Sequence, residues 1–209
     1  MTIPFWTAQG TIDLADIRPA DLTAEILGDT LAKLNRFGGR TREPWSVAAH
    51  SVLVERLCLP DLGPWGLLHD AHEAFLGDFT APAVELICRA GTRSAVEHAI
   101  RNAKGQLDRI IASAWGTSPR GLNIHLRRAD LFALQAEAVV FMGVRPELAH
   151  PSDADEVDRA VGLLIEMEAA RDWRAARDLW LSRVEHYAGL GRLIPPKTNP
   201  RRGIARTSN

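Results

Sequence analysis

Apolar residues recur at helical spacing along most of the chain, in stretches that proline and glycine separate. The first stretch predicts a helix from Asp21 to the glycines at 38 and 39, with Asp21 or Thr23 as its N-cap. Pro44 then predicts a second helix from Trp45 to about Leu57. Further helices are predicted over 65–75, from Pro82, from Thr92 or Ser94 to Ile111, and over 119–142, 152–168 and 172–187. The pattern therefore predicts an all-α helical bundle.

The two ends of the chain depart from this helical pattern. Residues 5–14 alternate loosely around Gly10, which is typical of a short hairpin or extended arm. Residues 194–209 carry proline, glycine and four basic residues, which favours a disordered tail, with a weak anion-binding arm as the alternative. We therefore divide the chain into an N-terminal arm (1–20), a helical domain (21–190) and a tail predicted to be disordered (191–209).

Charge and cysteine content narrow the classes of function. The 25 Lys and Arg oppose 26 Asp and Glu, so we expect no strong nucleic-acid binding and no attraction to an anionic membrane. No apolar run approaches the roughly 18 residues that a membrane span needs, and the first residues lack the pattern of a secretory signal. Cys58 and Cys88 are expected to be free thiols, which indicates a reducing, cytoplasmic compartment.

Polar side chains interrupt three of the apolar helical stretches. His50 lies in the second predicted helix and the pair His69–Asp70 in the third. A buried imidazole needs partners for its nitrogens, and a buried carboxylate needs a cation, so one divalent ion would satisfy all three. Adjacent helical residues point about 100° apart, which suits neighbouring positions around an octahedral ion. Asp130, in a later apolar stretch, offers a second carboxylate, and a satisfied core histidine is the alternative for each imidazole.

These residues match, in order and helical setting, the H…HD…D pattern of the HD-domain metal-dependent phosphohydrolases. The segments Leu34-Asn-Arg-Phe-Gly-Gly, Trp45-Ser-Val-Ala-Ala-His-Ser and Leu67-Leu-His-Asp-Ala-His-Glu-Ala-Phe-Leu-Gly-Asp resemble the 5′-deoxynucleotidase branch and its phage-encoded relatives, which include a dATP triphosphohydrolase. The resemblance covers roughly residues 5–145. It implies an HD-domain fold in which His50, His69, Asp70 and Asp130 hold one divalent cation. Mixed nitrogen and oxygen ligands admit Mn, Fe, Co, Ni, Zn or Mg.

The resemblance also implies roles for residues around the metal ion. Glu73 matches an acidic residue that handles the proton of the attacking water, and Asp78 matches a second carboxylate that would protonate the departing O5′. Arg36 aligns with an arginine that contacts the nucleotide. Phe37 and Trp45 are candidates to stack on the base, with core packing as the alternative.

The sequence departs from its relatives at one position. Val84 stands where they usually have a lysine, so a point positive charge for phosphate is missing. Arg40, Arg42 and Arg89 are the candidates to replace it. The departure weighs against tight binding of a triphosphate.

Two more side chains near the motif have open roles. His72 is expected to face solvent or to support the site, because the zinc-protease spacing HExxH is absent. Glu137 is expected either to anchor a neighbouring arginine or to form a buried structural salt link.

The expected activity follows from the motif and the resemblance together. We expect a cytoplasmic metal-dependent phosphohydrolase that converts deoxynucleoside 5′-monophosphates to deoxynucleoside and phosphate by attack of a metal-activated water. One alternative is a deoxynucleoside triphosphate triphosphohydrolase of the dATP type, against which Val84 weighs. The other is a non-catalytic nucleotide sensor, against which the intact Glu73 and Asp78 weigh. The relatives are homo-oligomeric, so a dimer or higher oligomer is expected.

Overall fold

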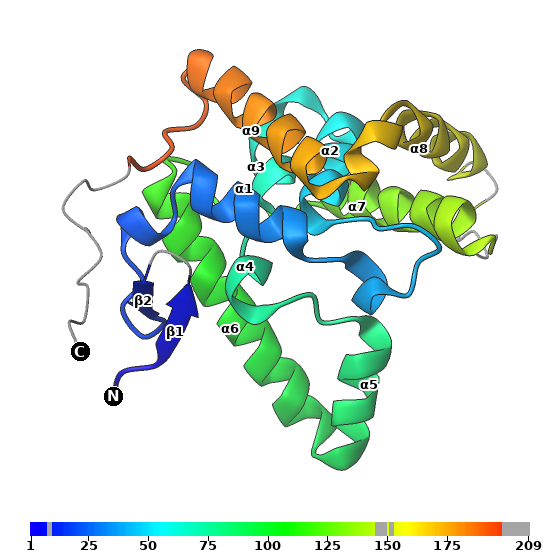
Figure 1. Ribbon diagram of the computed structural model, residues 1–209. Coiled ribbons are helices and arrows are strands. Elements are labelled where there is room, and N and C mark those ends of the chain that lie inside the picture. The colour runs from blue at the N-terminus through cyan, green and yellow to red at the C-terminus, as the bar shows by residue number, and fades with distance from the viewer. Residues whose placement is uncertain (8–9, 145–149, 151–152, 198–209) are drawn as a thin grey trace, which may run out of the picture.

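A two-stranded hairpin precedes a set of helices in the computed structural model, which describes residues 1–7, 10–144, 150 and 153–197 (Figure 1). Strands β1 (Pro4–Thr7) and β2 (Gly10–Asp13) pair antiparallel. Ile12 of β2 is buried in the hydrophobic core, so the N-terminal arm is a hairpin that packs on the helices. The remaining described elements are helical, which confirms the predicted all-α class.

Helix α2 lies at the centre of the helical core. It is buried from its first residue, Val47, to Glu55 near its C-terminal end. Because neighbouring helices cover it on several sides, both ends of α2 hold polar side chains away from water. The elements packed around it are α1 (Ala24–Lys33), α3 (Gly63–Leu68), α7 (Ile124–Glu137), α8 (Ala154–Glu166) and α9 (Trp173–Gly189).

Helices α5 (Ala81–Ala90) and α6 (Arg93–Ala114) form an arm that extends from this core (Figure 1). The two helices contact each other, and the arm leaves Leu86 70 % exposed. Only the C-terminal end of α6 enters the core, where Ile111 is fully buried. The arm therefore presents most of its surface to solvent.

The segment between α1 and α2 differs from the prediction. Helix α1 begins after the Thr23 N-cap and ends at Lys33, before the two glycines that were expected to stop it. The chain then runs extended, with Asn35 bridged to Ser46, and forms the 3₁₀ turn η2 (Arg36–Gly39). Phe37 in this turn has φ +56°, a left-handed conformation that is uncommon for residues other than glycine. The glycines therefore shape a turn that directs Arg36, instead of capping α1.

The helix predicted over 65–75 is split in two, which is the main correction to the sequence analysis. Helix α3 ends at Leu68 and helix α4 (Glu73–Leu76) follows after a tight turn. Backbone bonds in this turn span three residues: the N–H of Glu73 donates to the carbonyl of Asp70 at 2.9 Å. The pair His69–Asp70 therefore lies in the turn between these two helices.

Helix α7 also begins later than predicted, because Asn123 caps it by accepting the N–H groups of His125 and Leu126. Its last turn continues as a π-helical segment, η4 (Ala138–Met142), which ends at Gly143 in a left-handed conformation. The predicted end at Gly143 is confirmed, whereas Pro119 lies in the segment before the helix.

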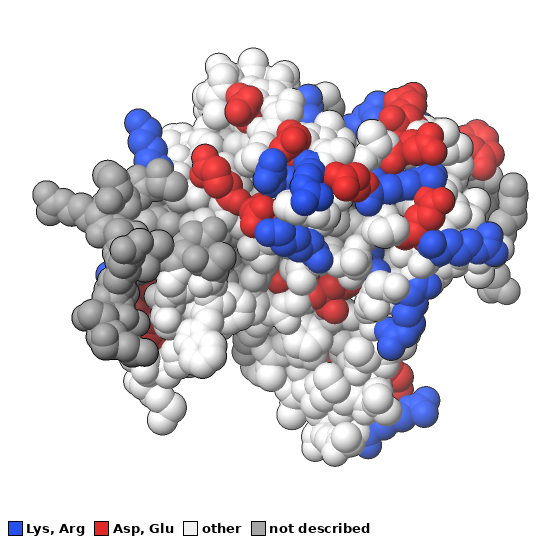
Figure 2. Space-filling model, viewed as in Figure 1, with Lys and Arg blue, Asp and Glu red and all other residues white. Residues whose placement is uncertain are grey.

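The remaining expectations concern surface and termini. Cys88 is buried and Cys58 half-buried, both as free thiols. Among the described residues, no helix has both the length and the apolar character required to cross a membrane. Basic and acidic side chains are interspersed on the face shown in Figure 2. Ile194 donates its N–H to the carbonyl of Trp115, and residues 198–209 of the predicted tail lie outside the described residues.

Candidate metal centre

Four side chains from three segments bring their donor atoms together. His50 comes from α2, His69 and Asp70 from the turn between α3 and α4, and Asp130 from α7. The Nε2 atom of His50 lies 3.1 Å from Asp130 Oδ1 and 3.6 Å from Asp70 Oδ2. The Nε2 atom of His69 lies 3.2 Å from Asp70 Oδ2 and 3.8 Å from Asp130 Oδ1. Two donors about 2.1 Å from one ion are about 3.0 Å apart at right angles and about 4.2 Å apart across the ion. His50, His69 and Asp130 therefore form one group of donor atoms that could hold a metal ion, and Asp70 lies beside both imidazoles.

The imidazole rings are oriented so that their Nε2 atoms face this centre. The Nδ1 atom of His50 lies 2.6 Å from Glu137 Oε1, and that of His69 lies 2.7 Å from the carbonyl oxygen of Gly66. Both partners only accept hydrogen bonds, so each Nδ1 carries a proton and each Nε2 is the nitrogen left to face the centre. Both Nε2 atoms are buried and find no donor among the described residues. Metal-ligating histidines have this arrangement.

The electrostatics of the centre favour a cation. Burial acts to lower the pKa of His69, but the charges of Asp70 and Asp130 overcome it and raise that pKa well above its usual value. Burial acts to raise the pKa of Asp70, but the neighbouring imidazoles and Arg36 hold it well below its usual value. The carboxylates therefore stay ionised and stabilise positive charge where the donor atoms converge.

Glu137, at the end of α7, contacts His50 on the side of the ring that faces away from this centre. It is fully buried, and its Oε1 accepts the Nε1–H of Trp45 at 2.8 Å as well as the His50 proton. Its Oε2 accepts the Nε–H of Arg36 at 3.2 Å. Burial acts to raise the pKa of Glu137, but Arg36 and His50 hold it below its usual value. Both expectations for Glu137 therefore apply: it anchors an arginine, and it does so within a buried salt link.

The three predicted substrate-binding residues occupy different environments. Trp45 is fully buried and packs against Phe141, with ring centroids 5.1 Å apart. Its ring has no exposed face for a base, so the core-packing alternative is the correct one for Trp45. Arg36 lies beside the metal donors, with Nη1 3.7 Å from Asp70 Oδ2. Phe37 is half-buried in η2, with the guanidinium of Arg36 5.7 Å from its ring.

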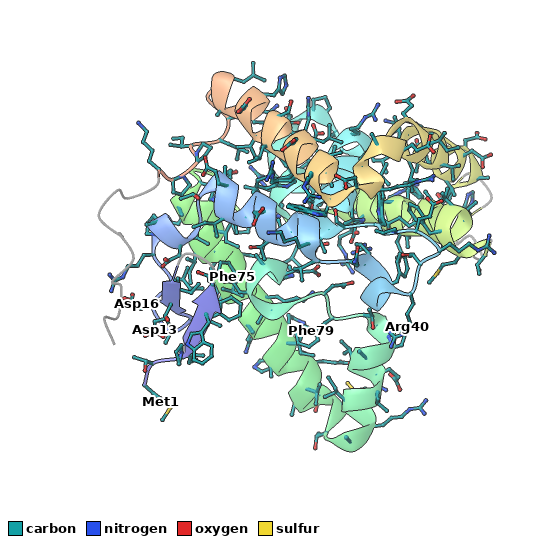
Figure 3. All side chains as sticks on the ribbon, viewed as in Figure 1. Met1, Asp13, Asp16, Arg40, Phe75 and Phe79 are labelled. Carbon is teal, nitrogen blue, oxygen red and sulfur yellow. The ribbon has the colours of Figure 1, made fainter. Side chains whose placement is uncertain are left out.

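Glu73 begins α4 directly after the turn that carries His69 and Asp70. It is buried, its Oε2 has no hydrogen-bond partner among the described residues, and its Oε1 lies 3.7 Å from Lys104 Nζ. Burial and the charges of Asp70 and Asp78 raise the pKa of Glu73 to about 8. Asp78 is half-buried in the connection from α4 to α5, and the residue after it, Phe79, is labelled in Figure 3. Glu73 and Asp78 therefore lie close enough for their charges to interact.

Helix α6 contributes two contacts that sequence reasoning missed. His72 is buried, and Asp108 Oδ1 lies 2.9 Å from its Nδ1, so His72 does not face solvent as one alternative expected. Together with Asp70 and Glu73, His72 forms a second group of donor atoms within 4.8 Å of one another. The second contact is that of Lys104 with Glu73. Lys104 and Asp108 are four residues apart and share a face of α6, but that spacing alone does not indicate what the face meets.

The three arginines considered as substitutes for a lysine at position 84 have other surroundings. Arg89 pairs with Glu85 on the exposed side of α5. Arg40 is exposed after η2 (Figure 3), and Arg42 donates its backbone N–H to the carbonyl of Phe141. Lys104 is the cation that contacts Glu73.

Comparison with known proteins shows relatives without an assigned activity. No family model matches the chain. An uncharacterized protein of Rhodobacter capsulatus is 41 % identical over 80 residues, which cover 34 % of this chain and 41 % of that protein. The uncharacterized protein YfdR of Escherichia coli is 26 % identical over 121 residues, which cover 58 % of this chain and 62 % of YfdR. The chain thus spans less than two thirds of each relative.

Proposed function

We propose that this chain is a divalent-metal-dependent phosphohydrolase of the HD-domain type, which converts deoxynucleoside 5′-monophosphates to deoxynucleoside and phosphate. The observation that carries the proposal is the convergence of two buried imidazole nitrogens with two aspartates. His50, His69, Asp70 and Asp130 would hold the ion. The resemblance of the surrounding segments to the 5′-deoxynucleotidase branch supports the choice of substrate. Cytoplasmic localisation remains a prediction from the free thiols, and a homo-oligomeric state remains a prediction from the same resemblance.

The bound ion supplies charge neutralisation at the phosphate oxygens and a lowered pKa for the attacking water. Arg36 supplies a second, fixed positive charge. Glu137 holds its Nε, while Nη1 lies toward Asp70 at the centre. A guanidinium oriented in this way is suited to donate hydrogen bonds to a phosphate oxygen.

Glu73 and Asp78 are the groups that would move protons. As the water oxygen forms its bond to phosphorus, Glu73 accepts the water proton. As the bond from phosphorus to O5′ breaks, Asp78 donates a proton to O5′. The pKa of Glu73, raised to about 8 by burial and by Asp70 and Asp78, is close to the range in which proton transfer at neutral pH is efficient.

A phosphate-release assay with a single substitution tests the proposal. Metal-loaded protein should release phosphate from at least one deoxynucleoside 5′-monophosphate, and Glu73→Gln should lower kcat by about 10²–10⁴-fold, because it removes the proton acceptor. Metal content should stay unchanged in this variant, since Glu73 is outside the four-residue donor set. Glu25→Gln is the matched control, because Glu25 also lies in the first turn of a helix but is exposed on α1.

The products separate the proposal from its alternatives. The proposal would be falsified if the protein released phosphate from none of the deoxynucleoside monophosphates with any divalent metal. One observation favours a triphosphohydrolase as the second candidate: four basic residues line the pocket beside Glu73 (Arg101, Lys104, Arg109 and Arg120). In that case phosphorus NMR would show triphosphate as the product. Nucleotide binding without turnover would indicate a sensor.

A further inference from the structure

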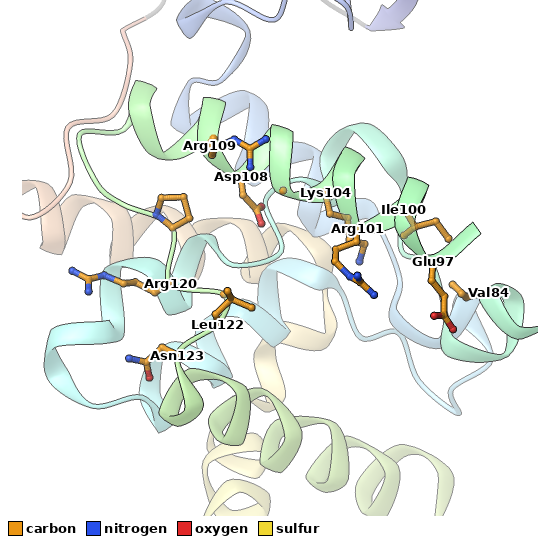
Figure 4. Close-up of a pocket in the computed structure, with 13 residues that line it drawn as sticks. Val84, Glu97, Ile100, Arg101, Lys104, Asp108, Arg109, Arg120, Leu122 and Asn123 are labelled. Carbon is orange, nitrogen blue, oxygen red and sulfur yellow. The ribbon is translucent and has the colours of Figure 1, made fainter. Parts of the chain in front are cut away.

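A pocket of about 860 Å³ lies between α5, α6 and the segment 119–123 (Figure 4). Lys104 and Asp108 belong to its α6 wall, and Leu122 and Asn123 to the opposite wall (Figure 4). Val84 of α5 closes one side. An open pocket of this size can accommodate a nucleotide-sized molecule.

Two direct contacts connect this pocket with the candidate metal centre. Lys104 Nζ lies 3.7 Å from Glu73 Oε1, and Asp108 Oδ1 lies 2.9 Å from His72 Nδ1. Glu73 and His72 in turn have donor atoms within 4.8 Å of Asp70, which is one of the four metal donors. The α6 wall of the pocket therefore meets the centre at the side of Glu73.

The charges in the pocket favour a ligand with an anionic group, and the apolar walls favour a ligand that also has an apolar part. Four basic residues line the pocket against two acidic ones, Glu97 and Asp108, and Asp108 is already engaged by His72. Val84, Ile100 and Leu122 supply apolar surface. Lys104 is a compact ammonium group, half-buried, and it is placed where the pocket meets Glu73.

We propose that this pocket binds the nucleotide, with the phosphoryl group between Lys104 and the metal centre and the nucleoside against Val84, Ile100 and Leu122. The identity of the ligand rests on the proposed function. Val84 and Lys104 line the same pocket, so α6 supplies the positive charge that α5 lacks at Val84. The proposal also moves the base away from Trp45, which is fully buried.

Two substitutions probe the pocket by different physical routes. Lys104→Gln removes the positive charge. Gly105→Leu fills the space, since Gly105 lines the pocket and a Cβ there would meet only Arg109 Nη1, at an ordinary 3.6 Å. Because glycine is a poor helix former, Gly105→Leu should preserve folding, which a thermal melt checks.

Each substitution has a matched control elsewhere on the chain. Lys33→Gln removes an exposed lysine of α1. Gly162→Leu replaces an exposed glycine inside α8 where a Cβ would meet nothing within 4 Å. Neither control residue lines the pocket.

The measurement is titration calorimetry of the metal-loaded full chain with the 5′-phosphonate analogue of deoxyadenosine monophosphate, whose P–C bond resists hydrolysis. Lys104→Gln and Gly105→Leu should each raise Kd about tenfold or more, and the controls should leave it unchanged. With deoxyadenosine as the probe, only Gly105→Leu should weaken binding. With inorganic phosphate, Lys104→Gln should have the larger effect.

The outcomes separate the pocket from the proposed activity. Unchanged Kd in both pocket variants, or no binding by the wild-type protein, would overturn the pocket assignment. If the wild-type protein hydrolyses monophosphates and both variants keep its KM, the activity stands and the pocket assignment is wrong. If both variants lose binding but the wild-type protein releases no phosphate, the pocket stands and the proposed activity is wrong.

Discussion

Helix α2 takes part in two buried carboxylate networks, one at each end. Near its N-terminus, His50 donates to Glu137, which also accepts from Trp45 and Arg36. Near its C-terminus, Glu55 accepts two hydrogen bonds from Arg183, at 2.8 and 3.1 Å, and one from the hydroxyl of Tyr187. Each network joins α2 to a helix far away in the sequence. Glu137 makes the link to α7, and Glu55 makes the link to α9.

The networks differ in whether a residue that donates to the carboxylate also has a second nitrogen that faces another group. Arg183 and Tyr187 direct their donor groups to Glu55, and the interaction serves to attach α9. In the other network one donor is an imidazole, whose second nitrogen is buried and faces two aspartates. A buried carboxylate can stabilise a fold with either kind of partner. A carboxylate also helps to bind a ligand only when its partner has a second atom that can coordinate one, because the hydrogen bond then orients that atom.

The largest expected effect is that of removing Glu137. Glu137→Ala leaves the buried Arg36 guanidinium, the Trp45 N–H and the His50 ring without their shared acceptor. We expect the free energy of unfolding of the metal-free protein to fall by about 3–5 kcal/mol. We also expect the affinity for a divalent metal ion to fall by about 10–100-fold, since the ring of His50 loses its orientation. Urea denaturation and metal titration measure the two effects.

Glu137→Gln sharpens this result, because it keeps the shape and one acceptor oxygen while removing the charge. It should fall between the wild-type protein and Glu137→Ala on both measurements. A full loss of stability with unchanged metal affinity would show that Glu137 does not orient His50.

The corresponding change in the other network is Glu55→Gln. It should lower the free energy of unfolding by about 1–3 kcal/mol, because Arg183 and Tyr187 lose a charged acceptor but Arg183 stays partly accessible to water. Metal affinity should be unchanged. A drop in metal affinity similar to that of Glu137→Ala would mean that both networks act on the centre only through general stability, and the contrast between them would be lost.

Long periodic segments explain why much of this arrangement was predictable from the sequence. The apolar spacing located α2, α6 and α9, and polar residues inside apolar stretches identified His50 and Asp130 as side chains in need of partners. The structure then brings their donor atoms together. Glu137 was a candidate for a buried salt link, with the anchoring of an arginine as the alternative.

Other features depend on contacts that no local pattern contains. The apolar spacing continues through 69–72, so it gives no sign that three-residue backbone bonds break the helix there. The sequence allows Trp45 either to stack on a base or to pack in the core, and only its packing on Phe141 decides between the two. Lys104 meets Glu73 because the tertiary fold brings α6 beside α4.

The smallest expected effect tests the Glu55 network by itself. Tyr187 is the single tyrosine of the chain, so tyrosinate absorbance reports on it alone. Burial, together with the hydrogen bond and charge of Glu55, raises the pKa of Tyr187 to about 12, against about 10 for a free side chain. The folded state thus favours the neutral phenol, so the stability it contributes is present below about pH 10 and is lost as the pH rises toward 12.

In Glu55→Gln the absorbance midpoint should move toward 10 but stay above it, since the charge is removed and the burial persists. His50→Ala, at the other end of α2, should leave the midpoint where it is in the wild-type protein. If it shifts the midpoint as far as Glu55→Gln does, the two networks are coupled along α2, and the candidate metal centre cannot be treated as separate from the attachment of α9. A wild-type midpoint near 10 would show instead that the Tyr187 hydroxyl does not donate to Glu55 in solution.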